Sequence, residues 1–328
     1  MRSKPSLKKQ QGIALITVLM ILAIMVTIAA TMTGRLTLSL KRTEGLIFSQ
    51  SVYWYGQAAG DFGRMILNQD LDDSSVVSLD QNWATPDMIF PLENGHIGGE
   101  IQDMRSCFNL NALAVKDGEN VRAVPVTQFQ SLLEALGVND YSAETIAESS
   151  RDWVDTNDVS NASQGAEDST YQARSVPHLA GNNLMVEVSE LRAVQGVSQS
   201  IYEHIAPYLC AIPSRDQSIN VNTVKIEHAA LLYALFENDF DLPLNDFTRL
   251  LEDRPTSGWD TVNDFLESNL FDELTFSSEF KKYLSVSSEY FQLNGLAEFE
   301  DRVIAVQILF EMDGNKAKVI RYQSGGLK

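Results

Sequence analysis

The chain has 328 residues, of which 44% are hydrophobic, and its 44 acidic residues outnumber 25 basic ones to give a formal net charge of −19. This length and apolar content are enough for two or three folded domains. Such an acidic surface disfavours binding to nucleic acid and to anionic membrane faces, which attract clusters of Lys and Arg.

An apolar run of 22 uncharged residues, from Ile13 to Gly34, follows a short basic leader. As a helix it would be about 33 Å long, enough to cross a hydrocarbon core of about 30 Å. The positive charges before it favour a cytoplasmic N-terminus, with everything after Thr33 on the far side of the membrane. A cleaved secretory signal fits less well, because its apolar region would be shorter and would end in a small-residue cleavage site. We predict a transmembrane helix at 13–34. The basic residues of the leader are Arg2, Lys4, Lys8 and Lys9.

The helical pattern continues to about residue 68, although several glycines lower the helix propensity and make packing necessary to hold this helix. Alternating or β-branched stretches predict strands at 96–104, 290–296, 302–311 and 316–322, and Asp313-Gly314 is a hairpin signal between the last two. The sheet is therefore split in sequence. We expect one part within residues 35–108, together with the helix, and the other within 286–328.

The segment between the two parts of the sheet, residues 109–285, is predicted to be an inserted all-α domain. Its apolar spacing and capping residues indicate short helices separated by Gly, Pro and Asn. The predicted helices cover residues 127–136, 142–154, 189–195, 199–208, 223–236, 244–252 and 262–270.

An acidic loop inside this insertion resembles no EF-hand, because Ser160 stands at the sixth position counted from Asp155, where Gly is needed, and Ala166 at the twelfth, where Glu is needed. A hard cation such as Ca²⁺ nevertheless takes six to eight oxygen ligands, which such a loop can supply. The alternative is a solvated acidic loop on an acidic protein. The loop contains Asp152, Asp155, Asn157, Asp158, Glu167 and Asp168, with Gly165 between them.

Cys107 and Cys210 are the two cysteines of the chain, and both follow the membrane segment. In an oxidising compartment they can form one disulfide, which in the chain-entropy model contributes about 4 to 5 kcal/mol for a loop of about 100 residues. A pair of buried free thiols is the alternative.

Catalysis and nucleic-acid binding are not indicated. The four histidines have no metal-ligand spacing, and the sequence has no nucleophile elbow or phosphate-binding glycine loop. Two stretches, 190–198 and 219–223, resemble pieces of helix-hairpin-helix modules, but acidic residues surround them where phosphate contacts would need Lys or Arg. We therefore expect no enzymatic activity and no nucleic-acid partner.

The leader Lys8-Lys9-Gln10-Gln11-Gly12 followed by Ile13 resembles that of type IV pilins and type II secretion pseudopilins. This resemblance implies that a prepilin peptidase cuts after Gly12 and methylates Ile13. Most members of that family have Glu at the fifth mature position, where this chain has Thr17. A carboxylate in hydrocarbon is costly unless a cation meets it, whereas the Thr hydroxyl can bond back to a carbonyl one turn earlier.

The chain resembles the minor pseudopilin K family of type II secretion systems in three respects. It lacks that Glu, it has a similar size, and several short motifs follow in the same order. The resemblance implies an α+β fold in which a pilin-like long N-terminal helix packs on an antiparallel sheet, with a large all-α domain inserted in the sheet sequence. It also implies calcium bound by Asp155, Asp158, Glu167 and Asp168, with Asn157 as a further candidate. The motifs are Phe108-Asn109-Leu110-Asn111-Ala112-Leu113, Asp152-Trp153-Val154-Asp155, Gly165-Ala166-Glu167-Asp168 and Ile219-Asn220-Val221-Asn222-Thr223.

We interpret the chain as a minor pseudopilin of the bacterial inner membrane, with its soluble part in the periplasm. It would stand at the tip of the secretion pseudopilus, initiate filament assembly with other minor pseudopilins, and support export of folded proteins across the outer membrane. The expected partners also include inner-membrane lipid and the prepilin peptidase. A minor pilin of a type IV pilus and a membrane-anchored calcium-dependent binding module are the alternatives.

Overall fold

The computed structural model describes residues 13–72, 74–92, 95–114, 122–160, 162–299 and 302–325. These described residues fall into two compact units, which meet in sequence between Gln57 and Ala58. The helix α1 runs without interruption from Ile13 to Leu71 and so belongs to both units. The predicted single helix is therefore confirmed. Its early part is long and apolar enough to cross a membrane.

Threonines in the apolar part of α1 are satisfied within the helix. The hydroxyl of Thr17 donates to the carbonyl oxygen of Ala14 at 2.9 Å, and Thr27 and Thr31 bond back in the same way. Such bonds use carbonyls one turn earlier and need no second chain. The polar groups of these side chains are thereby paired in the segment that lipid would surround.

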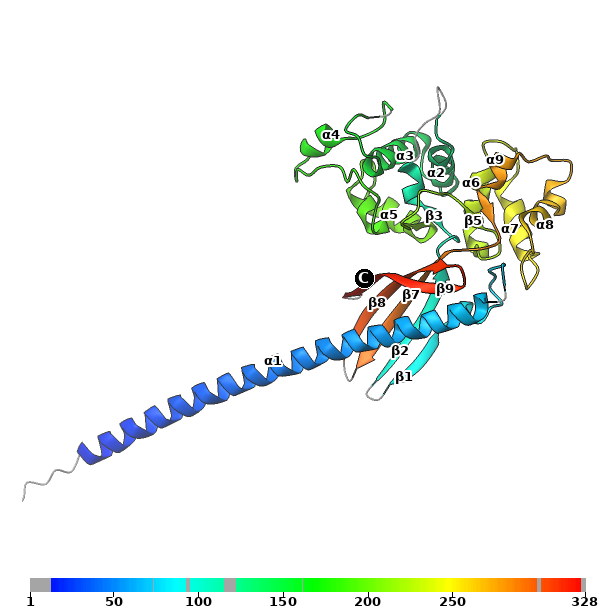
Figure 1. Cartoon of the computed structure of the whole chain (residues 1–328). Helices are drawn as coiled ribbons and strands as arrows, with labels where there is room; N and C mark the ends of the chain where they lie inside the picture. The colour runs from blue at the N-terminus through cyan, green and yellow to red at the C-terminus, as the bar shows by residue number, and fades with distance from the viewer. Residues whose placement is uncertain are drawn as a thin grey trace, which may run out of the picture. The chain divides into compact units, whose positions relative to one another are not determined.

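Five antiparallel strands form the main sheet, in the order β1-β2-β7-β8-β9 (Figure 1). The predicted strands are confirmed, and a two-residue turn at Gly314-Asn315, with Gly314 at φ 60°, connects β8 to β9. The edge strand β1 was not predicted. The strands are β1 Met88–Leu92, β2 Gly95–Asp103, β7 Tyr290–Phe299, β8 Arg302–Asp313 and β9 Lys316–Gly325.

The last turns of α1, within residues 58–71, pack on one face of this sheet. A Cβ placed on Gly63 would lie 2.9 Å from Cζ of Phe310, and one on Gly60 would lie 3.4 Å from Cδ1 of Ile308. The glycines therefore let the helix approach the strands closely. Asn68 Oδ1 also accepts from the backbone N–H of Ala317 at 2.7 Å, which fixes the helix against β9.

The inserted segment is mainly helical, as predicted, and two parallel pairs of two-residue strands are added to it. Four predicted helices differ in form. The helix predicted at 189–195 is a 3-10 helix at Val188–Ala193, and the one predicted at 223–236 is divided into a 3-10 turn at Ile226–His228 and the helix α6. Those predicted at 199–208 and 262–270 are each divided into a shorter α-helix and a 3-10 segment. The α-helices are α2 Val124–Ala135, α3 Asp140–Val154, α4 Asp168–Gln172, α5 Gln199–Ile205, α6 Ala230–Phe236, α7 Leu244–Glu252, α8 Val262–Leu266 and α9 Ser278–Lys281, and the short strands are β3 Phe108–Asn109, β4 Leu209–Cys210, β5 Ile219–Asn220 and β6 Leu284–Ser285. The remaining 3-10 segments are Asn82–Ala84, Leu110–Ala114, Ala206–Tyr208 and Asn269–Phe271.

A continuous apolar core fills the insertion and includes a cluster of phenylalanines between its later helices. The fully buried ring of Phe236 is central to this cluster and stacks on Phe271 with centroids 4.9 Å apart. Phe247 and Phe280 contact the same ring. Burial of aromatic rings at this density holds together helices that are individually too short to be stable.

Candidate metal centre and disulfide junction

The acidic loop connects the C-terminal end of α3 to the start of α4. The helix α3 is capped at its start by Asn139, whose Oδ1 accepts from the N–H of Ser142. Its last turn is buried and includes Asp152 and Trp153. The chain then passes through an exposed loop and returns at Ala166 and Glu167, both of which are buried. The loop therefore brings two buried acidic positions close together.

Three carboxylates converge at this point. Asp152, Asp155 and Glu167 each have an oxygen that lies within 4.8 Å of an oxygen of the other two. Two of them belong to the predicted ligand set, and Asp152 does not. Its position in a buried helical turn was the signal that could have added it, because a carboxylate at such a position needs a specific partner.

The other predicted ligands have protein partners. Asp158 Oδ1 accepts from the amide of Asn182 at 2.8 Å, and Asp168 Oδ1 accepts from the N–H of Ala180 at 2.9 Å. Asn157 folds back on Asp155, to which its amide donates at 2.9 Å. These contacts tie the loop to the segment after α4 and leave the three converging carboxylates as the compact group.

Glu167 has the most unusual electrostatic environment. Its side chain is buried, and both of its carboxylate oxygens lack a hydrogen-bond partner in the described part of the chain. Burial, reinforced by the negative charges of the surrounding aspartates, raises the pKa of Glu167 to about 8. A buried acid without donors is what a bound cation would satisfy, so the donor set fits a hard divalent ion such as Ca²⁺.

Gly165 makes the close approach of the loop possible. A Cβ at this position would overlap the carboxylate of Asp152 and the hydroxyl of Ser160. The neighbouring carbonyl of Gln164 accepts from the hydroxyl of Ser149 on α3 at 3.1 Å. Any side chain at Gly165 would therefore push the loop away from the end of α3.

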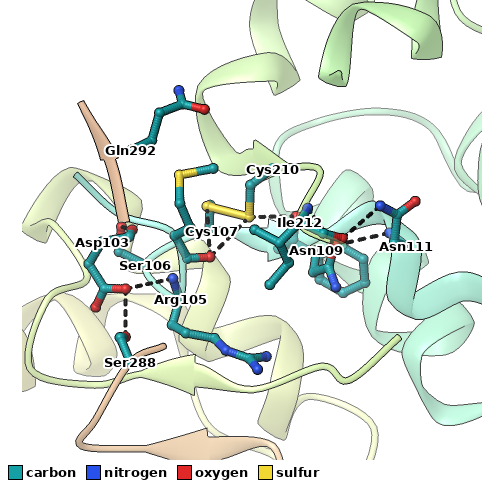
Figure 2. Close-up of a disulfide and its surroundings, with 12 residues drawn as sticks. Asp103, Arg105, Ser106, Cys107, Asn109, Asn111, Cys210, Ile212, Ser288 and Gln292 are labelled. Carbon is teal, nitrogen blue, oxygen red and sulfur yellow. Dashed lines mark hydrogen bonds between the residues drawn. A yellow bond between two sulfur atoms is a disulfide. The ribbon is translucent and has the colours of Figure 1, made fainter. Parts of the chain in front are cut away.

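A disulfide between Cys107 and Cys210 lies at the junction of the sheet and the insertion (Figure 2). The two Cα atoms are 5.7 Å apart, and the bond closes a sequence separation of 103 residues. The strands β3 and β4 pair beside it. An apolar cluster that includes Met104, Ile212 and Leu309 covers the bond. The junction is thus both covalent and well packed.

Asp103, at the end of β2, also connects the sheet to the insertion at this junction, through hydrogen bonds. It is 2% exposed and accepts four hydrogen bonds, from the N–H of Arg105, the hydroxyls of Ser288 and Thr223, and the amide of Asn220. Figure 2 shows the first two of these bonds. Burial raises the pKa of Asp103, and the four donors oppose that rise.

Asparagines in two of the four motifs that carry the family resemblance make buried hydrogen bonds at this junction and within the insertion. Asn109 Oδ1 accepts from the N–H groups of Asn111 and Ile212, and the Asn111 amide donates to the carbonyls of Met185 and Ile212. In the second motif, Asn222 donates to the carbonyl of Trp259. These buried side chains hold segments of the insertion together and are not available to contact a phosphate group.

At the start of the described chain, Ile13 is the first residue of α1, while Gly12 lies outside the described residues. The cleavage position therefore stays a prediction. Thr17 lies one turn into the helix, and its hydroxyl is paired with Ala14.

Two family models match the chain, both described as type II secretion system protein K, over residues 106–214 and 219–287. Type II secretion system protein K of Aeromonas hydrophila is 39% identical over 98% of this chain and 99% of its own, and that of Pectobacterium carotovorum is 35% identical over 98% of both. One chain in the crystal structure of the GspK-GspI-GspJ complex from enterotoxigenic Escherichia coli has a TM-score of 0.79 at 34% identity. The match covers 87% of this chain and all of the other.

Proposed function

Because this chain belongs to the protein K family of the type II secretion system, and so is a minor pseudopilin, we propose that it caps the pseudopilus. In this proposal it initiates filament assembly together with two smaller minor pseudopilins and thereby supports export of folded proteins across the outer membrane. The related crystal structure holds its chain in a complex with GspI and GspJ, which supports partners of this kind. Members of this family are structural components of a secretion system, and the family is not a known class of enzyme.

The proposal of a tip position rests mainly on Thr17, which stands where most members of the pilin superfamily have Glu. A carboxylate at this point of a filament helix needs a cation from the subunit above it, because an unpaired charge in an apolar environment is costly. The Thr17 hydroxyl is instead satisfied by Ala14 in its own helix. A subunit with no neighbour above it loses nothing by this exchange. The bulk of the insertion supports the same position, since a subunit of this size is too large to stack along a filament shaft.

The test compares Thr17→Glu with Thr17→Ala in a secretion assay. We expect Thr17→Ala to secrete normally, because alanine leaves no unpaired polar group. We expect Thr17→Glu to reduce both membrane accumulation and secretion, because its carboxylate has no partner. Equal secretion by the two variants would count against the argument from the missing carboxylate. Co-purification of the unchanged chain with two smaller pseudopilins tests the partners separately.

For processing, we propose cleavage between Gly12 and Ile13 by a prepilin peptidase, methylation of Ile13, and an N-terminus that faces the cytoplasm before cleavage. The apolar start of α1 would then remain in the inner membrane, with the soluble part in the periplasm. N-terminal sequencing of membrane-extracted protein decides this directly. A mature chain that begins at methylated Ile13 is expected, and a chain that begins at Met1 would contradict the proposal.

For calcium, we propose a structural site held by Asp152, Asp155 and Glu167. The ion would neutralise three converging negative charges and link the end of α3 to the start of α4. Backbone carbonyls, water and the more distant acids, Asp158 and Asp168, would complete the oxygen shell that Ca²⁺ requires. A ligand that binds only the folded state stabilises it by mass action, by about 2.7 kcal/mol at one hundred times its dissociation constant.

Calorimetry and thermal unfolding with and without millimolar Ca²⁺ test this site. We expect Ca²⁺ to raise the melting temperature of the unchanged chain and of Asp246→Asn, a control on α7. Asp155→Asn should lose most of that rise, because it removes one charge from the group. The absence of heat and of any thermal shift in the unchanged chain would leave only an acidic loop exposed to solvent.

A further inference from the structure

The face of the main sheet opposite the end of α1 is only partly covered. On one face, Leu293 and Phe310 meet Gly63 of α1. On the other face, Leu309 and its neighbours at one end are covered by the disulfide cluster. The rest of that face forms a groove of about 1270 Å³. This volume exceeds the roughly 300–1,000 Å³ typical of small-molecule sites.

A row of apolar and small residues crosses the five strands along the floor of the groove. The strand register places Ile89 next to Gly98, Gly98 next to Leu296, Leu296 next to Ala305, and Ala305 next to Gly325. Ile89 is 66% exposed and Leu296 is 47% exposed. Exposed apolar side chains in a hollow are a common mark of a binding surface, and the small residues between them would let a bound backbone approach the sheet.

A polar row lies beside the apolar row, on the side nearer the insertion. The register aligns Glu100, Asn294, Gln307 and Gln323 across four strands. The amide of Gln323 donates to the carboxylate of Glu187 from the insertion, which closes this end of the groove. Asn294 Oδ1 already accepts from the amides of Gln292 and Gln307, so the groups in the middle of the row that a ligand could use are the NH₂ of Asn294 and the Oε1 of Gln307, with a carboxylate at each end.

On the other side of the apolar row lie His96, Glu298 and Val303, where Nε2 of His96 is 3.7 Å from Oε2 of Glu298. The described lining residues include no Lys or Arg, and four carboxylates line the groove, those of Asp87, Glu100, Glu187 and Glu298. The groove is thus apolar along its floor and has an excess of negative charge around its rim, which Arg321, outside the lining, offsets in part at Glu187.

We propose that this groove binds an extended, positively charged peptide segment of a partner protein. Its cationic side chains would meet the rim carboxylates, and aliphatic side chains between them would cover Ile89 and Leu296. An extended segment suits the row of Asn and Gln, because its backbone N–H and C=O groups need partners that a helix already supplies to itself. Binding of this segment does not depend on the position of the chain in a filament.

The dimensions of the sheet set the length of the segment. Four strand spacings of about 4.8 Å make the apolar row about 19 Å long, and an extended chain covers this in about six residues at about 3.3 Å each. The segment should therefore carry Lys or Arg residues about five or six positions apart, with small aliphatic residues between them.

The experiment measures fluorescence anisotropy of a labelled dodecapeptide on the full chain in an uncharged detergent. The peptide has Lys at positions 3 and 9 and alternating Val and Ala elsewhere. We expect saturable binding that weakens with added salt, and at least tenfold weaker binding of the same peptide with Glu in place of Lys. Failure to bind at millimolar peptide, or equal binding of the Glu peptide, would overturn the proposal.

Variants of the chain locate the binding site. Glu100→Gln, an isosteric change at an exposed position, should weaken binding about threefold, and Leu296→Lys at least tenfold. Glu252→Gln removes an exposed charge on α7 and is the matched control, with no expected effect. Unchanged affinity in Glu100→Gln, or tighter binding of a helix-stapled peptide with the same composition, would refute an extended segment in this groove.

Discussion

Replacement of Asp103 tests how the insertion is held on the sheet. Asp103→Asn keeps the side-chain volume but exchanges one carboxylate oxygen for an NH₂ group. Oδ1 accepts from the N–H of Arg105 and the hydroxyl of Ser288, while Oδ2 accepts from the amide of Asn220 and the hydroxyl of Thr223. A hydroxyl can turn and accept, but an N–H group cannot. Whichever way the new amide turns, its NH₂ group faces either Arg105 or Asn220.

The magnitude follows from this geometry. A buried donor left without an acceptor costs about 1–3 kcal/mol, and bonds to a charged acceptor are stronger than neutral ones. We therefore expect Asp103→Asn to lower the free energy of unfolding by about 2–4 kcal/mol. Asp103→Ala should cost about 4 kcal/mol or more, because all four donors lose their acceptor. Ser288→Ala removes one donor and should cost about 1 kcal/mol.

Urea unfolding of the full chain in an uncharged detergent, followed by near-ultraviolet circular dichroism, measures these differences. The three variants should rank in the order Ser288→Ala, Asp103→Asn, Asp103→Ala. A value for Asp103→Asn within about 0.5 kcal/mol of the unchanged chain, the range of ordinary surface substitutions, would refute the view that this carboxylate fastens the insertion.

Three further predictions concern packing, the disulfide and pH. Gly63→Ala should lower the melting temperature, because its Cβ would lie 2.9 Å from an atom of a buried ring. Gly45→Ala has nothing within 4 Å of its Cβ and should raise the free energy of unfolding by about 0.5–1 kcal/mol. Equal shifts of the calorimetric melting temperature in the two variants would contradict this. Replacement of Cys107 and Cys210 by Ser should cost about 4–5 kcal/mol for a loop of about 100 residues, and a thiol titration of the unreduced, unfolded chain should find no free thiol; two free thiols would end the idea of a bond. The pKa of Glu167 rises from 4.5 to about 8 on folding. Between these two values the folded state keeps a proton that the unfolded state has released, so the free energy of unfolding of the calcium-free protein should fall as the pH rises from about 4.5 to 8. Glu167→Gln should flatten that decline in thermal unfolding, and an unchanged decline in the variant would refute the assignment.

The regular elements were predictable because their signals are local. Alternation in β7, β8 and β9 specifies which side chains point to each face, and the apolar run of α1 specifies a helix without reference to the rest of the chain. The strand β1 was missed for a local reason as well. Pro91 interrupts its pattern, and a proline is tolerated there because β1 is an edge strand, a property that only the folded sheet reveals.

The chemistry of the junction was less predictable, because it depends on pairs that are distant in sequence. Asn220 stands in a motif that suggests a piece of a DNA-binding module, but its amide is buried against Asp103, 117 positions earlier. Similarly, Asp152 joins Glu167 only because Gly165 lets the loop fold onto the end of α3. Composition and spacing indicate that acids and amides are present, whereas burial decides which of them meet.

The entropic cost of closing the long insertion explains why the bonds that hold it lie together at one corner of the sheet. β2 and β7 are paired neighbours, although Ser288, just before β7, follows Asp103 by 185 positions. Closing a flexible loop of that length costs about 2.6 kcal/mol more than closing one of ten residues, because the cost grows only with the logarithm of length. The Asp103 hydrogen bonds and the Cys107–Cys210 bond both act where the chain leaves and re-enters the sheet, and their expected contributions are larger than this penalty. A large helical domain can therefore be carried between two paired strands while their register, from Gly95 with Phe299 to Asp103 with Phe291, remains intact.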